Sequence, residues 1–276
     1  MATLRQLLRH LFRSGTSRQS SASPKPRWYS VSSTREYETC PRRYQFAYVD
    51  RVPTDRGLAP EGWRFGTVVH RGLEAAYRQH QAVGDSPDLT HTVPVALEAV
   101  REAWASEQMP DDPAARGRAE EVVRRSLVST CLEPADILGV EHHFRAETPD
   151  GCRISGFADL VLRRGDFGIE IRDHKVTRHL CTPEQLTEDF QLNLYGWLAL
   201  QEWPWAHAIS ASHHYPLGGE LAHVDLDETN MEAAVLRVRT VASRAEADAE
   251  FVPMPGEHCE SCVWSSLCPE ALSISA

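Results

Sequence analysis

The chain has 276 residues, 42% of them hydrophobic and 25% charged, which is an ordinary balance for a soluble globular protein of one large or two small domains. No stretch approaches the roughly 18 uninterrupted apolar residues that a membrane span requires, so no membrane partner is expected. The net charge of −10 excludes a protein that coats nucleic acid over its whole surface, although an acidic body can still carry a local basic groove.

The charge is distributed unevenly along the chain. Residues 1–44 hold nine Arg and Lys against two acids, a balance of +7, so the remainder carries −17. We expect residues 1–29 to be a basic flexible leader, because a short basic amphipathic helix precedes a Ser/Pro-rich stretch at 14–26. This composition resembles a mitochondrial transit peptide, but a basic extension of a bacterial protein looks the same. The expected location is cytoplasmic, with the mitochondrial matrix as the alternative.

Hydrophobic spacing predicts a helical section at the start of the folded chain. A capping box of Ser33 and Glu36 indicates a helix that runs to about residue 48, and Pro and Gly at 53–62 end that unit. Three further helical patterns follow, at residues 63–81, 94–108 and 113–131.

The pattern then changes to runs rich in Ile, Val and Phe. A helix is expected across 183–202, because Thr182, Pro183 and Gln185 supply an N-cap, a first-turn proline and a capping partner. A last helix is expected to be capped by Thr229 and Glu232. The predicted strands are 137–147, 153–163, 167–176, 206–216 and 220–226. Together these elements predict an α/β fold with a mixed central sheet flanked by helices.

The residues that carry chemistry lie in the β section. Asp159 sits inside the otherwise apolar run 156–161, where an unpaired carboxylate is costly to bury. Asp173 and Lys175 share one face of the next strand, because side chains alternate with a period of two. Two converging carboxylates bind Mg²⁺ or Mn²⁺, and a neighbouring lysine can orient or deprotonate a water. The alternative is a surface hairpin in which Asp173 forms a salt bridge with a nearby base.

Lysine usage favours a chemical role for Lys175. The chain has two lysines, Lys25 and Lys175, against 27 arginines. An arginine-biased genome explains the general scarcity of lysine. Arginine stays charged and cannot act as a base, whereas the pKa of a lysine shifts with its surroundings.

Two more candidate positions lie on predicted helices. Gln191 and Tyr195 are four residues apart and therefore share one helix face. His70 follows Gly66 in a helical pattern, and a lone histidine in such a position is more often structural or solvated than a metal ligand.

The order G-x-x-x-H, G-F-A-D, D-x-K and Q-x-x-x-Y resembles the nuclease domain of the RecB-like branch of the PD-(D/E)XK superfamily, over roughly residues 30–268. The resemblance implies a restriction-endonuclease-like fold in a domain spanning 30–276. It also implies a role for each matched residue: His70, Asp159 and Asp173 hold the metal, Lys175 assists the attacking water, and Gln191 and Tyr195 support the site or contact DNA.

Two positions qualify the resemblance. His174 stands where this branch usually has an apolar or aromatic residue, and only its backbone carbonyl is expected to reach the metal. Glu141 is a further candidate acid.

The seven cysteines include a close C-terminal cluster, Cys259, Cys262 and Cys268. Cys40 is the candidate fourth ligand, and the spacing resembles the iron–sulfur nucleases of the same branch, which include AddB-type subunits, CRISPR-associated adaptation nucleases and a mitochondrial exonuclease group. The resemblance implies a [4Fe–4S] cluster that joins residues 30–50 to 255–270. A zinc site, with His258 as a substitute ligand, is the alternative.

The function expected from these residues is metal-dependent hydrolysis of DNA, as an exonuclease in DNA repair, recombination or defence. Arg42, Arg43 and Arg178 are candidate phosphate contacts or, equally, solvated surface charges. The DNA is expected to have single-stranded character, and a separate helicase partner must unwind it, because the chain has no G-x₄-G-K-[ST] phosphate loop. The alternatives are a catalytically inactive DNA-binding subunit of the same fold and a CRISPR adaptation nuclease.

Overall fold

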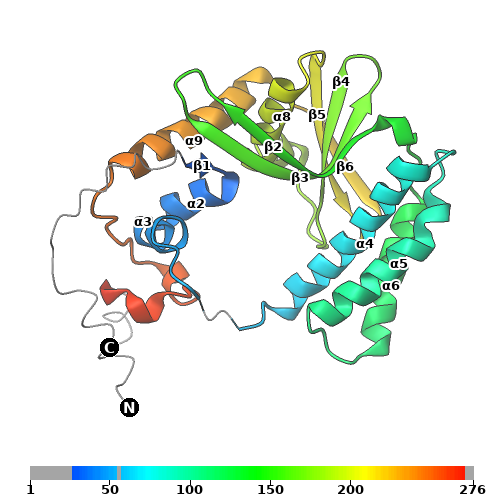
Figure 1. The fold of residues 1–276 in the computed structure, drawn as a ribbon, viewed down its shortest axis with the longest axis horizontal. Coiled ribbons are helices and arrows are strands. Elements are labelled where there is room, and N and C mark those ends of the chain that lie inside the picture. Colours follow the sequence, from blue (N-terminus) through cyan, green and yellow to red (C-terminus); the bar gives the residue numbers. More distant parts are fainter. Residues whose placement is uncertain (1–26, 55–56, 271–276) are drawn as a thin grey trace.

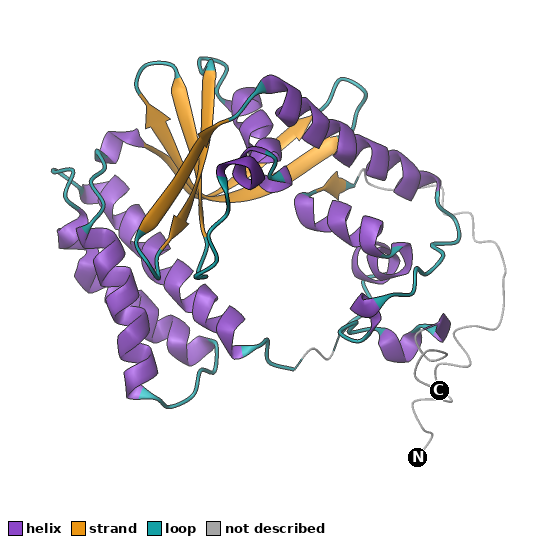
Figure 2. Cartoon of the chain, turned by 180° about the vertical axis from the view of Figure 1, so that it is seen from behind, coloured by secondary structure: helices purple, strands orange, loops and turns teal. Residues whose placement is uncertain are grey.

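A mixed six-stranded sheet forms the centre of the molecule, with helices on both of its faces (Figures 1 and 2). The computed structural model describes residues 27–54 and 57–270, so most of the predicted leader lies outside the described residues. The strands are β1 (Trp28–Tyr29), β2 (Ile137–Glu147), β3 (Arg153–Arg164), β4 (Gly168–His174), β5 (Ala208–Tyr215) and β6 (Glu220–Asp225). The predicted α/β class with a mixed central sheet is confirmed.

Strand β3 organises the sheet because it pairs with three other strands. The antiparallel β2 runs along one edge, from Ile137 opposite Leu162 to Glu147 opposite Arg153. The other edge is shared between the short parallel β1 and the antiparallel β4, which pairs from residue 160 onward. Beyond β4 lie the parallel β5 and the antiparallel β6. Asp159 therefore lies directly beyond the last paired residues of β3 and β4, Leu160 and Arg172.

Three helices of the first half of the chain cover one face of the sheet. They are α4 (Glu61–Val83), α5 (Val93–Ser106) and α6 (Pro113–Val128). Their apolar side chains, among them Val69 and Leu73, pack with Leu160 and Leu162 of β3 in what we term the second core. The helix layer and this end of the sheet are joined mainly by hydrophobic burial.

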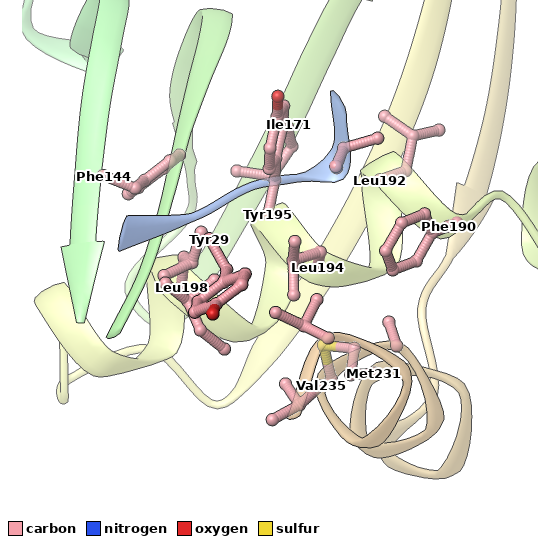
Figure 3. Packing of buried hydrophobic residues seen from close by; sticks show 14 of the residues in the cluster. Tyr29, Phe144, Ile171, Phe190, Leu192, Leu194, Tyr195, Leu198, Met231 and Val235 are labelled. Atoms are coloured by element: carbon pink, nitrogen blue, oxygen red, sulfur yellow. The ribbon is translucent and has the colours of Figure 1, made fainter. Parts of the chain in front are cut away.

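The first core lies on the opposite face. It is formed under α2 (Val31–Thr39), α7 (Pro183–Thr187), α8 (Phe190–Glu202) and α9 (Glu228–Ala247). Figure 3 shows Leu194 and Leu198 of α8 between the sheet residue Ile171 and Val235 of α9, with Tyr29 of β1 beside them. The strand β1 was not among the predicted elements.

The two ends of the described chain are held together through α9. The Tyr29 hydroxyl donates a hydrogen bond to the Ala242 carbonyl at 3.4 Å, and the Tyr37 hydroxyl donates to Asp248 at 2.9 Å. Figure 1 shows β1 and α2 beside α9, with the C-terminal segment near α3 (Pro41–Tyr44). Residues 27–44 are thus part of the folded domain.

The predicted first helix is wrong in its cap and its continuity. Helix α2 starts at Val31, and its capping box is formed by Ser30 and Ser33 rather than by Ser33 and Glu36. The helix ends at Cys40, whose backbone is extended at φ −162°, because the following Pro41 has no N–H to continue the helical hydrogen bonding. A π-helix at Gln45–Val49 follows α3.

Two later helix boundaries also differ. The capping box of Thr182 and Gln185 is confirmed, but it caps only the short α7. A second cap at Asp189, whose carboxylate accepts from the Leu192 N–H at 2.9 Å, starts α8. Helix α9 is capped by Asp227 instead of Thr229, again through a side-chain oxygen. No helix of the described residues is long and apolar enough to cross a membrane.

Candidate active site

The two predicted acids meet at the end of β4, each held by a hydrogen bond. Asp159 Oδ2 accepts from the backbone N–H of His174 at 2.7 Å, beyond the point where the β3–β4 pairing ends. Asp173 Oδ1 accepts from the Gln191 side-chain amide at 2.9 Å. The negative charge of Asp173 reaches Asp159, so the two carboxylates form one site.

Lys175 completes this site from the residue that follows the strand. Its Nζ lies 2.8 Å from Asp173 Oδ2, and about a third of its side chain is exposed. Burial lowers the pKa of Lys175, but the ion pair and hydrogen bond with Asp173 outweigh it and raise the pKa above its usual value. The amine is therefore protonated in this arrangement and acts as a hydrogen-bond donor.

His70 and Glu141 approach Asp159 from two other elements. His70 lies on α4, and its Nδ1 is 3.5 Å from Asp159 Oδ2. Glu141 lies on β2 with a positive φ of 47°, a conformation that residues other than glycine rarely adopt. One ligand atom from each of His70, Glu141 and Asp159 lies within 4.8 Å of the other two. Sequence analysis supplied both candidates, and backbone strain of the kind found at Glu141 is common at functional sites.

Burial makes this group of acids unfavourable without a cation. Desolvation, followed by the charge of Asp173, raises the pKa of Asp159 to about 7. Desolvation and then the charge of Asp159 raise the pKa of Glu141. A nearby positive ion would relieve both effects, since it favours the charged carboxylates.

The side chain of His174 points away from the acids. It is buried, its ring stacks on Tyr77 at 5.7 Å, and its Nδ1 lies 2.9 Å from Nδ1 of His214. Desolvation and the neighbouring His214 lower the pKa of His174 well below its usual range. The ring is thus neutral. The expected contact of the His174 backbone carbonyl with the metal stays a prediction.

Tyr195 supports β3 instead of reaching the acids directly. The side chain is 7% exposed, and its hydroxyl hydrogen-bonds the backbone of Phe157. A Cβ placed on Gly156 would come within 2.4 Å of the Tyr195 ring, so the glycine of the G-F-A-D motif makes room for the tyrosine of the Q-x-x-x-Y motif. Burial raises the pKa of Tyr195 to about 12. The two motifs are coupled through packing.

An open pocket lies between α4 and the β2–β3 pair, beside the acids. Its wall includes Trp63, Thr67 and Glu74, which sequence analysis did not single out, together with His70 and Asp159. Trp63, Thr67 and Glu74 lie seven, three and four residues from His70, so helical spacing from His70 was the available signal. The side chain of Trp63 is 75% exposed.

The four predicted cysteine ligands line a second pocket. Cys40 comes from the break between α2 and α3, and Cys259, Cys262 and Cys268 come from the C-terminal segment. The Met254 N–H donates to Cys40 Sγ at 3.5 Å, and the Gly256 N–H donates to Cys259 Sγ at 3.5 Å.

The three predicted phosphate contacts do not line the pocket beside the acids. Arg42 and Arg43 line the cysteine pocket; Arg42 donates to Gln45, and Arg43 pairs with Glu36 at 2.9 Å. Arg178 is exposed in the segment after β4.

Comparisons with known proteins agree with this geometry. The sequence matches the PD-(D/E)XK nuclease superfamily over residues 29–269. The chain belongs to this superfamily. A solved structure of a protein from Eubacterium rectale, provisionally described as an exonuclease, is similar to this nuclease with a TM-score of 0.52 and 12% identity over 85% of this chain and 86% of that one. The protein SSO0001 aligns over 98% of both chains at 16% identity with a TM-score of 0.38. No curated protein matches.

The donor set of the nuclease site suits a divalent cation. Two carboxylates and one imidazole converge, and oxygen-rich sets of this kind suit Mg²⁺ and Mn²⁺. The raised pKa values of Asp159 and Glu141 are the physical sign of the fit, because burial and the neighbouring acids make their charged forms unfavourable and a cation would offset that cost.

Replacing Asp159 with asparagine should stabilise the metal-free nuclease more at pH 8 than at pH 5. The pKa of Asp159 is about 7 in the folded chain and about 4 when unfolded, so the charge penalty on folding grows as the pH rises between those values. Asparagine stays neutral and can still accept the His174 N–H. The unfolding temperatures of the variant and the unaltered chain, measured in EDTA at pH 8 and at pH 5, give the gain in stability at each pH.

Asp166→Asn, in the exposed β3–β4 turn, is the control and should change the unfolding temperature little at either pH. An equal gain for Asp159→Asn at both pH values would show that its charge is not the source of the penalty.

Proposed function

We propose that this chain is a Mg²⁺- or Mn²⁺-dependent deoxyribonuclease of the RecB-like branch that acts as an exonuclease in DNA repair, recombination or defence. The observation that carries the proposal is the convergence of Asp159, Asp173 and Lys175 with His70 and Glu141 at one strand end. The order of the motifs along the chain supports the branch.

The residues of the site have separate roles in the proposed hydrolysis of the phosphodiester. His70, Glu141, Asp159 and Asp173 would hold the cation, which when bound supplies Lewis-acid activation of water and stabilisation of the charge that develops on phosphate. The protonated amine of Lys175 donates a hydrogen bond that orients the attacking water. Gln191 holds one oxygen of Asp173 and so leaves the other to face Lys175.

Cleavage by an Asp173→Asn variant tests the proposal. The expected result is a loss of Mg²⁺-dependent cleavage of single-stranded and duplex DNA by more than about 100-fold, because loss of one preorganised electrostatic group in a site costs on that order. Asp225→Asn, an exposed acid at the end of β6, is the matched control and should keep full activity. Cleavage unchanged by Asp173→Asn, or absent from the unaltered protein with every divalent metal, would favour an inactive DNA-binding subunit.

Lys175→Arg should be nearly as damaging as Lys175→Ala, with a loss of about 10²–10³ in rate. A guanidinium keeps the charge but is wide and planar, so it cannot occupy the space between Asp173 and the attacking water as the compact amine does. Cleavage rates at saturating Mg²⁺ measure the loss. DNA affinity with Ca²⁺ in place of Mg²⁺ should stay within a few-fold, and an arginine variant that keeps more than a tenth of the rate would reduce Lys175 to a charge contact.

The proposal includes a [4Fe–4S] cluster on Cys40, Cys259, Cys262 and Cys268. Backbone N–H groups directed at two of these sulfurs support it, because such hydrogen bonds are a normal part of cluster sites. The alternative is a zinc site on the same cysteines.

Anaerobically purified protein should be brown and contain about four iron and four sulfide per chain, as a four-cysteine cluster requires. Cys40→Ser should lose the colour and expose residues 255–270 to proteolysis, because the C-terminal segment loses its link to α2 and α3. Cys131→Ser, at an exposed thiol outside the cysteine pocket, is the matched control and should stay brown. Colourless protein with stoichiometric zinc would contradict the cluster.

The substrate and surroundings follow from the same reasoning. DNA with single-stranded character is the proposed substrate, supplied by a separate helicase where the DNA is duplex. The domain predicted to span 30–276 is proposed to begin slightly earlier, with β1, after a basic leader. Its proposed location is the cytoplasm or, if the leader is a transit peptide, the mitochondrial matrix.

A further inference from the structure

One side of the β2–β3 pair is not covered by either core. In the half of the pair next to the hairpin turn, Phe144, Ala146 and Ile154 point into the first core, so the alternate residues His143, Arg145, Arg153 and Phe157 point the other way. Figure 1 shows the β2–β3 hairpin projecting away from α4, α5 and α6, the helices that cover this side of the sheet elsewhere. The side chain of Phe157 is 56% exposed there.

Aromatic and basic side chains alternate over this uncovered surface. The rings of Phe157 and His143 are stacked at 4.1 Å with an angle of 8° between them. Further along, the guanidinium groups of Arg145 and Arg153 both lie over the ring of Trp28, at 5.5 Å and 5.7 Å. We term these five residues the β2–β3 track.

Part of the positive charge of the track is unneutralised. Arg153 pairs with Glu147 at 3.2 Å, whereas Arg145 is exposed and forms no ion pair with any described carboxylate. On a chain with a net charge of −10, a free guanidinium beside exposed rings is a local site for a negatively charged and aromatic ligand.

The track begins next to the acid site. His143 pairs with Phe157, and the next outward residues along the same two strands are Glu141 and Asp159. Two residues of a strand span about 7 Å, so the stacked pair lies within one nucleotide of a phosphate held at the acids. The α4 helix that carries His70 also packs on this side of the sheet.

We propose that the β2–β3 track binds the single-stranded portion of the DNA whose phosphodiester lies at the acid site, an inference that rests on the proposed nuclease function. A base stacks on the exposed ring of Phe157, and Arg145 contacts a phosphate beyond it. Unpaired bases favour such a ring because their faces are free, whereas bases inside a duplex stack on one another. The alternation of rings with guanidinium groups fits a nucleic acid strand better than an apolar protein segment.

Binding of a fluorescent single-stranded oligonucleotide of about 12 nucleotides, measured by anisotropy in Ca²⁺, tests the track in the full chain. Phe157→Ala should weaken binding by about tenfold, in line with the loss of one stacked base, and Phe157→Tyr should restore it. Arg145→Ala should lower the slope of log affinity against log salt by about 0.7, the contribution of one phosphate contact on a single strand. Blunt duplex of the same length should show no loss with Phe157→Ala.

The chain offers matched controls on other surfaces. Phe167 is 61% exposed and stacks on His207 at 5.8 Å, as Phe157 stacks on His143. Arg163 lies over Trp205 at 4.4 Å, as Arg145 lies over Trp28. Phe167→Ala and Arg163→Ala should bind as the unaltered chain does. Losses in the track variants no larger than in these controls would overturn the proposal, as would an equal loss on blunt duplex.

The metal site is tested apart from the track by hydrolysis of bis(p-nitrophenyl) phosphate with Mn²⁺ and the unaltered protein, since this small diester has no strand to occupy the track. If it is not hydrolysed while the track variants still lose oligonucleotide affinity, the proposed nuclease function fails and the binding surface stands. If the diester is hydrolysed but the track variants bind the oligonucleotide as the unaltered chain does, the nuclease function stands and the proposed binding surface fails.

Discussion

The buried proximity of Asp159 and Asp173 is the constraint on which the rest of the site depends. Two carboxylates this close repel one another, and desolvation adds to the cost of charging them. Neighbouring groups offset part of this electrostatic cost. The His174 N–H binds Asp159, while Gln191 and Lys175 bind the two oxygens of Asp173. Because the arrangement still raises the pKa of Asp159 to about 7, the chain keeps a site that is favourable only for a proton or a cation.

Sequence analysis anticipated the parts of this molecule that depend on periodicity and local chemistry. All five longer strands were predicted close to their observed bounds, since short runs rich in Ile, Val and Phe between turn signals are typical of strands. Strand β1 escaped prediction because two residues carry no period, and it is defined by its pairing with β3 far along the chain. The helix errors at Ser33 and Thr229 arose where several Ser, Thr and Asp residues compete for one cap.

The site was predictable as a set of residues, although not as a geometry. Asp173 and Lys175 share a strand face by their spacing alone. The hydrogen bond from the His174 N–H to Asp159 instead requires the pairing of β3 with β4 to end at Leu160 and Arg172, which spacing does not predict. Glu141 has a positive φ that its sequence context does not signal. Gly156 and Tyr195 are 39 positions apart, and only packing reveals why each needs the other.

Strand β4 can hold the acids in place because its opposite face is fixed by buried charges. Glu170 is 2% exposed and pairs with both Arg164 and Arg172, and Ser212 of β5 donates to the same carboxylate. Burial raises the pKa of Glu170, but the two guanidinium groups and the serine outweigh it and lower the pKa, so the network stays charged. A buried network of this kind contributes little net stability, yet any slip of β4 against β5 would leave its charges unpaired. The register that places Asp173 and Lys175 is therefore fixed from the other face of β4.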